Sequence, residues 1–116
     1  MQKLRAGFNC FAMFISITAH AGGQSGTIAA LNVTSPSLAF GNPTHFRLTG
    51  EYKNRAGCST HAEQWWALNT DSAVGKAMLG VLLTAKASGK PVTVWGSGRC
   101  DQRVDMEDVH QIGVSE

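Results

Sequence analysis

The residues best suited to acid–base chemistry or cation binding are four carboxylates in one polar segment, at Asp101, Asp105, Glu107 and Asp108. Neighbouring carboxylates can share a proton or hold a hard cation, but calcium loops place their oxygen ligands in a tighter and more regular pattern. We therefore interpret this segment as a solvated acidic loop. A cation site and an acid–base pair are the alternatives.

Two cysteines and two histidines together have the composition of a zinc site. Cys58 and His61 are separated by two residues, but nine residues separate Cys100 from His110, and that gap fits no common zinc spacing. The chain has a third cysteine, Cys10, which would be removed with the N-terminal export signal described below. The even pair that would remain in an exported chain is typical of a disulfide. We predict a Cys58–Cys100 bridge that stabilises the fold by about 4 kcal/mol through loop closure. The spacing of the histidines His45, His61 and His110 along the chain reveals no set of nucleophile, base and orienting group. The sequence therefore indicates a protein that is not an enzyme and has no cofactor.

Aromatic and polar side chains in the strand-like segments are the candidates for ligand binding. Exposed aromatic rings stack on sugars or bases, and nearby polar groups fix the orientation of the ligand. The candidates are Ser25, Arg47, Glu51, Trp65, Trp66 and Trp95. Core packing is the alternative for each tryptophan. Trp65 and Trp66 are adjacent in a strand, so we expect one in the core and the other on a surface, under the helix or against a neighbouring subunit.

The first 21 residues have the organisation of a secretory signal. Lys3 and Arg5 form a basic start, residues 6–18 are mostly apolar, and Ala19-His20-Ala21 fits the small-x-small pattern before a cleavage site. The apolar stretch is shorter than the roughly 20 residues that a membrane span needs. We expect cleavage after Ala21 and one secreted or periplasmic domain, residues 22–116, with a mobile start at 22–24. A buried N-terminal helix is the alternative.

The charge of the chain gives no indication of nucleic-acid binding. The chain has 10 Lys and Arg against 8 Asp and Glu, a formal net charge of +2. Loss of Lys3 and Arg5 with the signal leaves 8 of each sign. Nucleic-acid binding needs a concentrated basic face, which a neutral chain without charge blocks does not provide.

Five segments have the composition or alternation of strands, at residues 25–34, 45–52, 63–69, 91–95 and 109–114. In the second, apolar and polar residues alternate with the period of two that a half-buried strand requires. Gly26 near the start of the first suggests a bulge or a close backbone approach.

A helix is expected between the third and fourth strands. Thr70 or Asp71 supplies the N-cap, Gly89 the left-handed C-cap, and Pro91 prevents continuation. The predicted buried stripe recurs at helical spacing through Val74, Met78, Val81, Leu82 and Ala85.

The helix is unusually rich in small residues, Gly75, Ala77 and Gly80. Each glycine costs a helix roughly 0.8–1 kcal/mol relative to alanine. We therefore expect a close neighbour, either the chain's own sheet or another copy of the chain. Gly75-Lys76 is not a phosphate loop, because Thr70 and Ala77 stand where that motif needs Gly and Ser or Thr.

The element order predicts a mainly β fold with one helix, a partly open five-stranded barrel of the oligonucleotide/oligosaccharide-binding (OB) type with the helix between strands 3 and 4. Short motifs along the chain resemble the B subunit of subtilase cytotoxin and its pertussis-like relatives among bacterial AB5 toxins. The motifs are Ser25-Gly26, Asn42-Pro43…Phe46-x-Leu48-x-Gly50, Cys58…Trp66 and Ala85-x-x-x-Gly89-Lys90-Pro91-Val92.

The resemblance implies an OB barrel that forms a ring of five around a catalytic A subunit and binds sialylated cell-surface glycans. Ser25 matches a serine of that family that contacts the sugar, and Glu51 lies near the position of an acidic partner. The chain departs from the family at the Gly96-Ser-Gly-Arg-Cys100 loop. We expect a glycan-binding module that forms a ring. A monomeric module with another ligand is the alternative, and a small secreted hydrolase is a third hypothesis.

Overall fold

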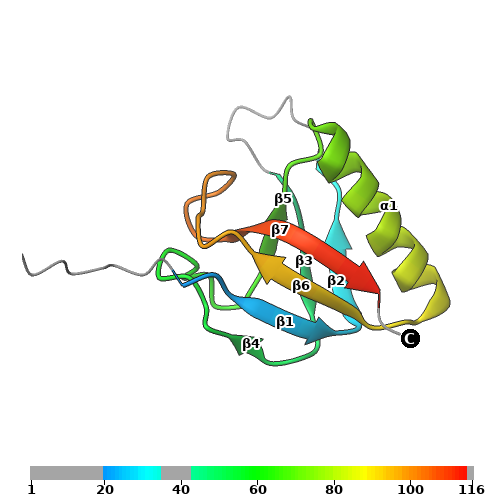
Figure 1. Ribbon diagram of the computed structural model, residues 1–116, viewed down its shortest axis with the longest axis horizontal. Helices are drawn as coiled ribbons and strands as arrows, with labels where there is room; N and C mark the ends of the chain where they lie inside the picture. Colours follow the sequence, from blue (N-terminus) through cyan, green and yellow to red (C-terminus); the bar gives the residue numbers. More distant parts are fainter. Residues whose placement is uncertain (1–19, 35–42, 115–116) are drawn as a thin grey trace, which may run out of the picture.

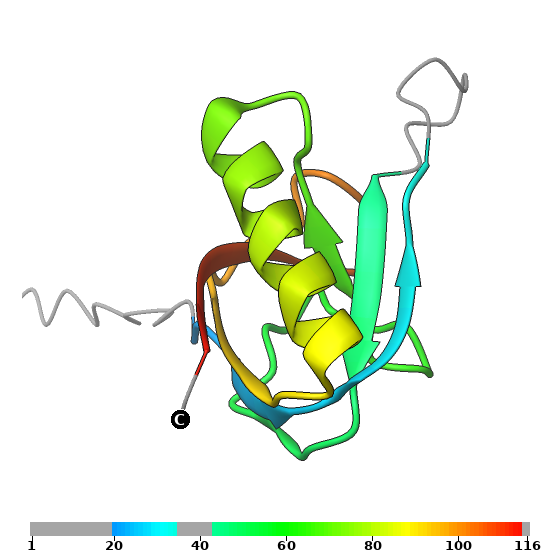
Figure 2. The same cartoon turned by 90° about the vertical axis from the view of Figure 1, so that its right-hand side faces the viewer.

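The computed structural model describes residues 20–34 and 43–114, so the expected secretory signal, up to residue 19, lies outside the described part. The fold is mainly β with one helix, as predicted. Its strands form one curled, half-open sheet, and the helix packs against β7 and β2 (Figures 1 and 2). Within the described residues, no helix is both long and apolar enough to cross a membrane.

The described strands are β1 (Gly23–Gly26), β2 (Ile28–Asn32), β3 (Thr44–Leu48), β4 (Tyr52–Lys53), β5 (Trp66–Leu68), β6 (Val92–Gly96) and β7 (Glu107–Val114). The helix α1 (Ala73–Ser88) connects β5 to β6. Their order in the sheet is β2-β3-β5-β7-β6-β1-β4. The β5–β7 pair is parallel and the other pairs are antiparallel.

The prediction of five strands is wrong in number, because residues 20–34 and 43–114 form seven. The first expected strand is interrupted at Thr27 and forms β1 and β2. The second is interrupted after Leu48 and forms β3 and β4. A close backbone approach at the first break confirms the expectation for Gly26, since a Cβ added there would lie 2.6 Å from the Gly50 nitrogen. The sheet therefore bends sharply at this point.

This bend curls the sheet. β1 and β2 are separated only by Thr27, yet β2 lies at one end of the strand order and β1 lies near the other. The Thr49 amide donates a hydrogen bond to the Thr27 carbonyl, 3.0 Å away, and ties the bend to the chain between β3 and β4. One short segment of chain therefore takes part in both halves of the curl.

The core fills the inside of the curl. In β3, Thr44, Phe46 and Leu48 are buried while His45 and Arg47 are half-buried, which confirms the predicted alternation. The main apolar cluster consists of Ile28, Phe46, Leu48, Tyr52, Trp66, Leu68, Leu82, Ala85, Val92 and Val94.

The ends of the helix are set by its caps. The N-cap is Ser72, not Thr70 or Asp71, and its Oγ accepts a hydrogen bond from the Gly75 amide at 2.9 Å. The Asp71 amide donates to the Asn69 side chain instead, so a turn precedes the helix and delays its start. At the other end Gly89 has the predicted left-handed conformation, with φ 66°.

The helix is buried along a narrower stripe than expected. Leu82 and Ala85 are buried, Met78 and Val81 are half-buried, but Val74 is 64% exposed, so its assignment to the stripe is wrong. Val74 lies in the first turn, beyond the part of the helix that covers the core. The helix crosses the sheet diagonally in Figure 2.

The small residues of the helix divide into two groups. Gly75 packs on its own chain, because a Cβ added there would lie 1.5 Å from the Asn69 carbonyl oxygen. Gly80 has no atom within 4 Å of such a Cβ and faces open space. Close packing inside the chain therefore explains Gly75 but not Gly80.

Candidate functional site

An open groove of about 540 Å³ is lined by residues in and beside strands β4, β1 and β6. These three strands are neighbours in the sheet (Figure 1). It brings together three of the candidate ligand-binding residues, Ser25, Glu51 and Trp95. The residues that line it are Ala21, Gly22, Gly23, Gln24, Ser25, Glu51, Lys53, Asn54, Thr93, Val94 and Trp95. We take this groove as the candidate site.

Trp95 gives the groove an aromatic wall. Val92, Val94 and Gly96 of β6 are buried, so the alternation of the strand turns Trp95 outward, where it is 44% exposed. Its ring lies over β7, 3.5 Å from the position of a Cβ added at Gly113. A large ring supported from behind and exposed in front is a surface on which a flat apolar face can stack.

Polar groups stand beside this wall. The hydroxyls of Ser25 and Thr93 lie 2.9 Å apart across the β1–β6 pair. Glu51 and Lys53 are both exposed at the β4 side, next to Asn54, whose φ is 50°. The groove therefore presents hydroxyl, carboxylate, amide and ammonium groups around one aromatic face, a set suited to a polyhydroxylated ligand.

Trp66 lies in the core and not in the groove. It is 0% exposed and stacks on Tyr52, with ring centroids 4.4 Å apart and 11° between the planes. Its indole N–H donates to the Gln24 side-chain oxygen at 2.7 Å, beneath the groove. The side chain has no exposed surface, so a role of Trp66 in ligand binding stays a prediction that its position does not support.

Trp65 and Arg47 form a separate cluster. Trp65 is 8% exposed and packs with Ala67 and Met106, and the Arg47 guanidinium carbon lies 5.6 Å from its ring centroid. His45 meets the same ring edge-on, at 4.8 Å. Neither Trp65 nor Arg47 lines the groove. Trp65 and Trp66 pack into different clusters, but both are buried, and the exposed tryptophan is Trp95.

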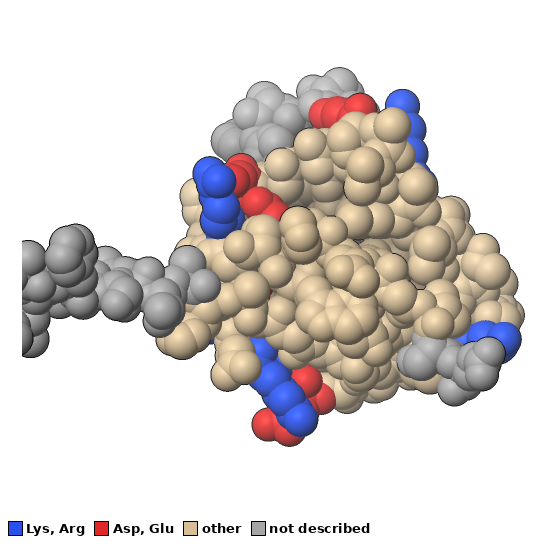
Figure 3. All heavy atoms as spheres, viewed as in Figure 1, with Lys and Arg blue, Asp and Glu red and all other residues tan. Residues whose placement is uncertain are grey.

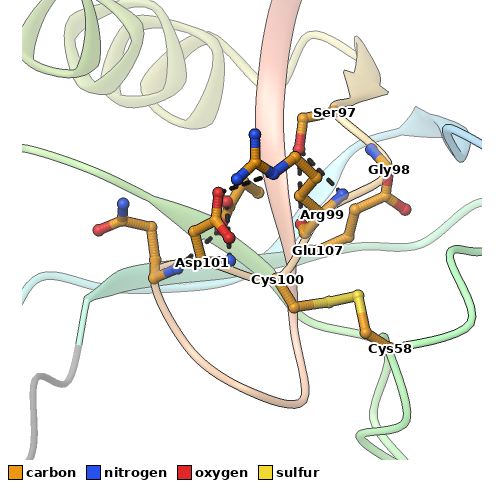
Figure 4. A network of polar contacts seen from close by, with 9 residues as sticks. Cys58, Ser97, Gly98, Arg99, Cys100, Asp101 and Glu107 are labelled. Carbon is orange, nitrogen blue, oxygen red and sulfur yellow. Dashed lines mark hydrogen bonds and ion pairs between the residues drawn. A yellow bond between two sulfur atoms is a disulfide. The ribbon is translucent and has the colours of Figure 1, made fainter. Parts of the chain in front are cut away.

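The most heavily hydrogen-bonded side chain near the groove is Glu107, for which the sequence predicts a position in a solvated loop. That placement is wrong, because Glu107 is 0% exposed. Its Oε2 accepts from the amides of Gly22 and Gly98, both at 3.0 Å. Its Oε1 accepts from the Tyr52 hydroxyl at 2.7 Å and the Ala56 amide at 3.2 Å. Figure 4 shows Glu107 turned toward the 97–101 loop.

Burial and the hydrogen bond to Glu107 raise the pKa of the Tyr52 hydroxyl well above its usual value. Both effects favour the neutral phenol, since burial penalises the phenolate and the neighbouring carboxylate repels it. No sequence signal marked Glu107, because a glutamate between Met106 and Asp108 looks like part of a polar run.

The other carboxylates of this segment have structural partners. Asp101 pairs with Arg99 at 3.0 Å on the surface, and Asp105 pairs with Arg103 at 2.9 Å. The Asp108 side chain accepts hydrogen bonds from the backbone amides of Asp101 and Gln102, at 2.9 and 3.1 Å. The segment is thus a self-bonded loop, and among the described residues no group of three or more His, Cys, Asp or Glu could hold a metal ion.

The predicted disulfide is confirmed. The Cys58 and Cys100 sulfurs are bonded at 2.09 Å and link the loop after β4 to the loop after β6 (Figure 4). The His61 amide donates to the Asp105 carbonyl at 3.1 Å, and His110 is exposed on β7. The zinc alternative is excluded for this pair of cysteines, because both thiols are used in the bridge.

Charged side chains are sparse on the face shown in Figure 3, where they form small groups of both signs near its edge. No family model, curated protein sequence or solved structure matches this chain.

Proposed function

We propose that the chain is an exported binding module that holds a carbohydrate in the groove over β4, β1 and β6. The observation that carries the proposal is the position of Trp95, half-exposed beside the Ser25–Thr93 hydroxyl pair. Sugar rings have an apolar face that stacks on indole and a rim of hydroxyls that needs hydrogen-bond partners. The groove offers both.

The sheet topology supports an OB-type barrel as the finer description of the fold. If β1 with β2 and β3 with β4 are each counted as one bent strand, the chain has five strands with the helix between the third and fourth. The first bent strand then contributes to both ends of the sheet, and the third and fifth pair in parallel. OB barrels bind oligosaccharides and oligonucleotides on such a sheet.

The resemblance to AB5 toxin B subunits narrows the carbohydrate class to sialylated glycans. Ser25, which matches the sugar-contacting serine of that family, lies in the groove, as does Glu51. A sialic acid also carries a carboxylate, and Lys53 is the cation among the described residues that line the groove. We assign Lys53 the role of carboxylate partner.

A glycan array tests the site. We expect the exported protein to bind sialylated glycans, and Trp95→Ala or Ser25→Ala to weaken binding at least tenfold, about 1.4 kcal/mol. Thr27→Ala is the matched control. Thr27 lies two residues after Ser25 but does not line the groove. Its hydroxyl is paired with the Thr49 hydroxyl at 3.1 Å, so the variant removes a similar hydroxyl pair outside the site.

Binding that is unchanged in both Trp95→Ala and Ser25→Ala would refute the groove as the site. Binding only to neutral glycans, unaffected by Lys53→Ala, would refute the sialic acid assignment but not the groove.

We also propose assembly as a ring of five, with a catalytic A subunit as partner. On α1, Val74 and Leu83 are 64% and 50% exposed, and Gly80 faces open space. Light scattering at micromolar concentration should give five times the mass of one chain. A single-chain mass would favour the alternative, a monomeric secreted or periplasmic module without a toxin role.

A further inference from the structure

Glu107 is a buried side chain whose hydrogen-bond donors are all uncharged. Three are backbone amides and one is a phenol, and each carboxylate oxygen accepts two of them, the arrangement of an ionised carboxylate. Within residues 20–34 and 43–114, the ion pairs are formed by other carboxylates. An ionised carboxylate buried without a cation carries a desolvation penalty that neutral donors offset only in part.

One of the four donors is the backbone nitrogen of Gly22, 3.0 Å from Glu107 Oε2. Gly22 is the residue that follows the expected cleavage site. His20 and Ala21 are exposed, whereas Gly22 is buried. The change from exposed to buried residues therefore coincides with the bond that the sequence pattern marks for cleavage.

Gly22 is also held in place, contrary to the expected mobile start. Its carbonyl accepts a hydrogen bond from the Gly96 amide at 2.8 Å. A Cβ added at Gly22 would lie 2.5 Å from the Tyr52 ring and 2.7 Å from Glu107 Oε1. The position accepts no side chain, so the nitrogen lies at a fixed point beside the carboxylate.

We propose that hydrolysis of the Ala21–Gly22 peptide bond creates an N-terminal ammonium that forms a buried ion pair with Glu107, so that the domain gains its full stability only after processing. An export peptidase breaks the C–N bond with water. The hydroxyl of the water joins the Ala21 carbonyl carbon, which leaves as a carboxylate. The Gly22 nitrogen keeps its own hydrogen, takes up the remaining proton of the water and the proton released by the new carboxyl group, and becomes the ammonium.

The ion pair needs no rearrangement of the fold. The nitrogen already lies at hydrogen-bond distance, and the other donors already fix the orientation of the carboxylate. The amide of Gly22 already donates to the carboxylate, and cleavage would add the Coulomb attraction between a unit positive and a unit negative charge at that distance. The inference depends on the proposed export but not on any ligand, so failure to bind glycans would leave it intact.

The first test uses the full chain, exported and processed by a bacterial host. We expect the mature mass to correspond to a chain that begins at Gly22. A second chain carries one serine inserted between Ala21 and Gly22. Only the processed product that keeps this serine as its first residue, as identified by its mass, is compared with the wild-type product. Both products have the same net charge, but in the second the Gly22 nitrogen is again a neutral amide.

We expect the inserted serine to raise the unfolding equilibrium constant about tenfold or more, measured by urea denaturation. In a Glu107→Gln background the insertion should have little effect, because the charged partner is absent. Equal unfolding constants of the wild-type and serine-inserted products, or a mature chain that begins elsewhere than Gly22, would overturn the proposal.

Carbamylation by cyanate, followed by mass spectrometry, gives a readout that does not require Glu107→Gln to fold. The α-amino group should react at least tenfold more slowly in the folded wild-type product than in the serine-inserted product, and equally in both after unfolding in guanidinium. Equal rates in the folded proteins would contradict a buried ammonium.

Discussion

At the scale of single residues, a chain of buried polar groups connects the core to the floor of the groove. The Gln24 side chain accepts from the Trp66 indole at 2.7 Å and donates to the Leu48 carbonyl at 3.3 Å. Tyr52, stacked on Trp66, donates to Glu107. Each of these groups is buried with a partner, which is what allows polar side chains to lie within a small core.

Tyr52 gives this network a spectroscopic probe, because it is the only tyrosine in the chain. Burial and the Glu107 hydrogen bond raise its pKa in the folded protein above the value of about 10 in the unfolded chain. The folded state therefore holds this proton more tightly. Its contribution to stability is complete below pH 10 and is lost as the pH rises above that value.

We expect tyrosinate absorbance to stay absent in the folded protein at pH values where free tyrosine is ionised. It should appear only with alkaline unfolding, followed in parallel by circular dichroism. A normal titration near pH 10 in the folded protein would show that Tyr52 is solvated and that the network is wrong.

At the scale of elements, helix α1 is positioned by its ends more than by its apolar stripe. Only Leu82 and Ala85 among the predicted apolar positions are fully buried, while Ser72 and Gly89 satisfy the backbone groups at the two ends. Lys86 also donates from its ammonium to the Ile28 carbonyl at 3.0 Å and links the last turn to β2.

Ser72→Ala should lower the free energy of unfolding by about 1 kcal/mol, because the Gly75 amide loses its side-chain acceptor. Thr70→Ala is the control, since Thr70 is one of the two predicted N-caps and lies within the turn that precedes the helix. Urea denaturation of the two variants measures the difference. A larger loss in Thr70→Ala than in Ser72→Ala would move the cap back to the predicted position.

At the scale of the whole molecule, long-range connections hold the curled sheet together. β5 and β7 pair in parallel across most of the second half of the chain, and the disulfide joins residues 42 positions apart. The loops it joins also supply the Gly98 and Ala56 amides that donate to Glu107. The bridge therefore limits the freedom of the segments that bury this carboxylate.

Replacing both Cys58 and Cys100 by serine should lower the free energy of unfolding by about 4 kcal/mol, because the unfolded chain regains the entropy of an open loop. A reducing agent should destabilise the wild-type protein to a similar extent and leave the double variant unchanged. Equal stability of the oxidised and reduced wild-type protein would contradict a structural role for the bridge.

Much of the fold could be predicted because it depends on local patterns. The alternation from His45 to Tyr52, the helix with its end at Gly89, and the cysteine pair are all readable along the chain. The number of strands was wrong because the breaks at Thr27 and after Leu48 arise where two backbones meet, at Gly26 and Gly50. A local sequence pattern cannot reveal such a contact, because the residues that form it are distant in the sequence.

The candidate site could be predicted only in part. Ser25 and Glu51 do lie in one groove, together with Trp95. Trp65 and Trp66 do not lie in the groove. The sequence could not reveal this, because composition shows that a ring is available but not on which side of a curled sheet it lies. Glu107 was missed because its burial depends on loops from two other parts of the chain.

The amino-acid sequence by itself determined the class of fold, the position of the helix and the pairing of the cysteines. Hydrophobic period and capping residues act locally, and of the three cysteines only Cys58 and Cys100 remain once Cys10 leaves with the expected signal. Only the tertiary structure decided which tryptophan is exposed, where the groove lies and that Glu107 meets the Gly22 nitrogen. These features come from the curl of the sheet, which brings together segments as far apart as residues 22 and 107 and fixes which groups are withdrawn from water.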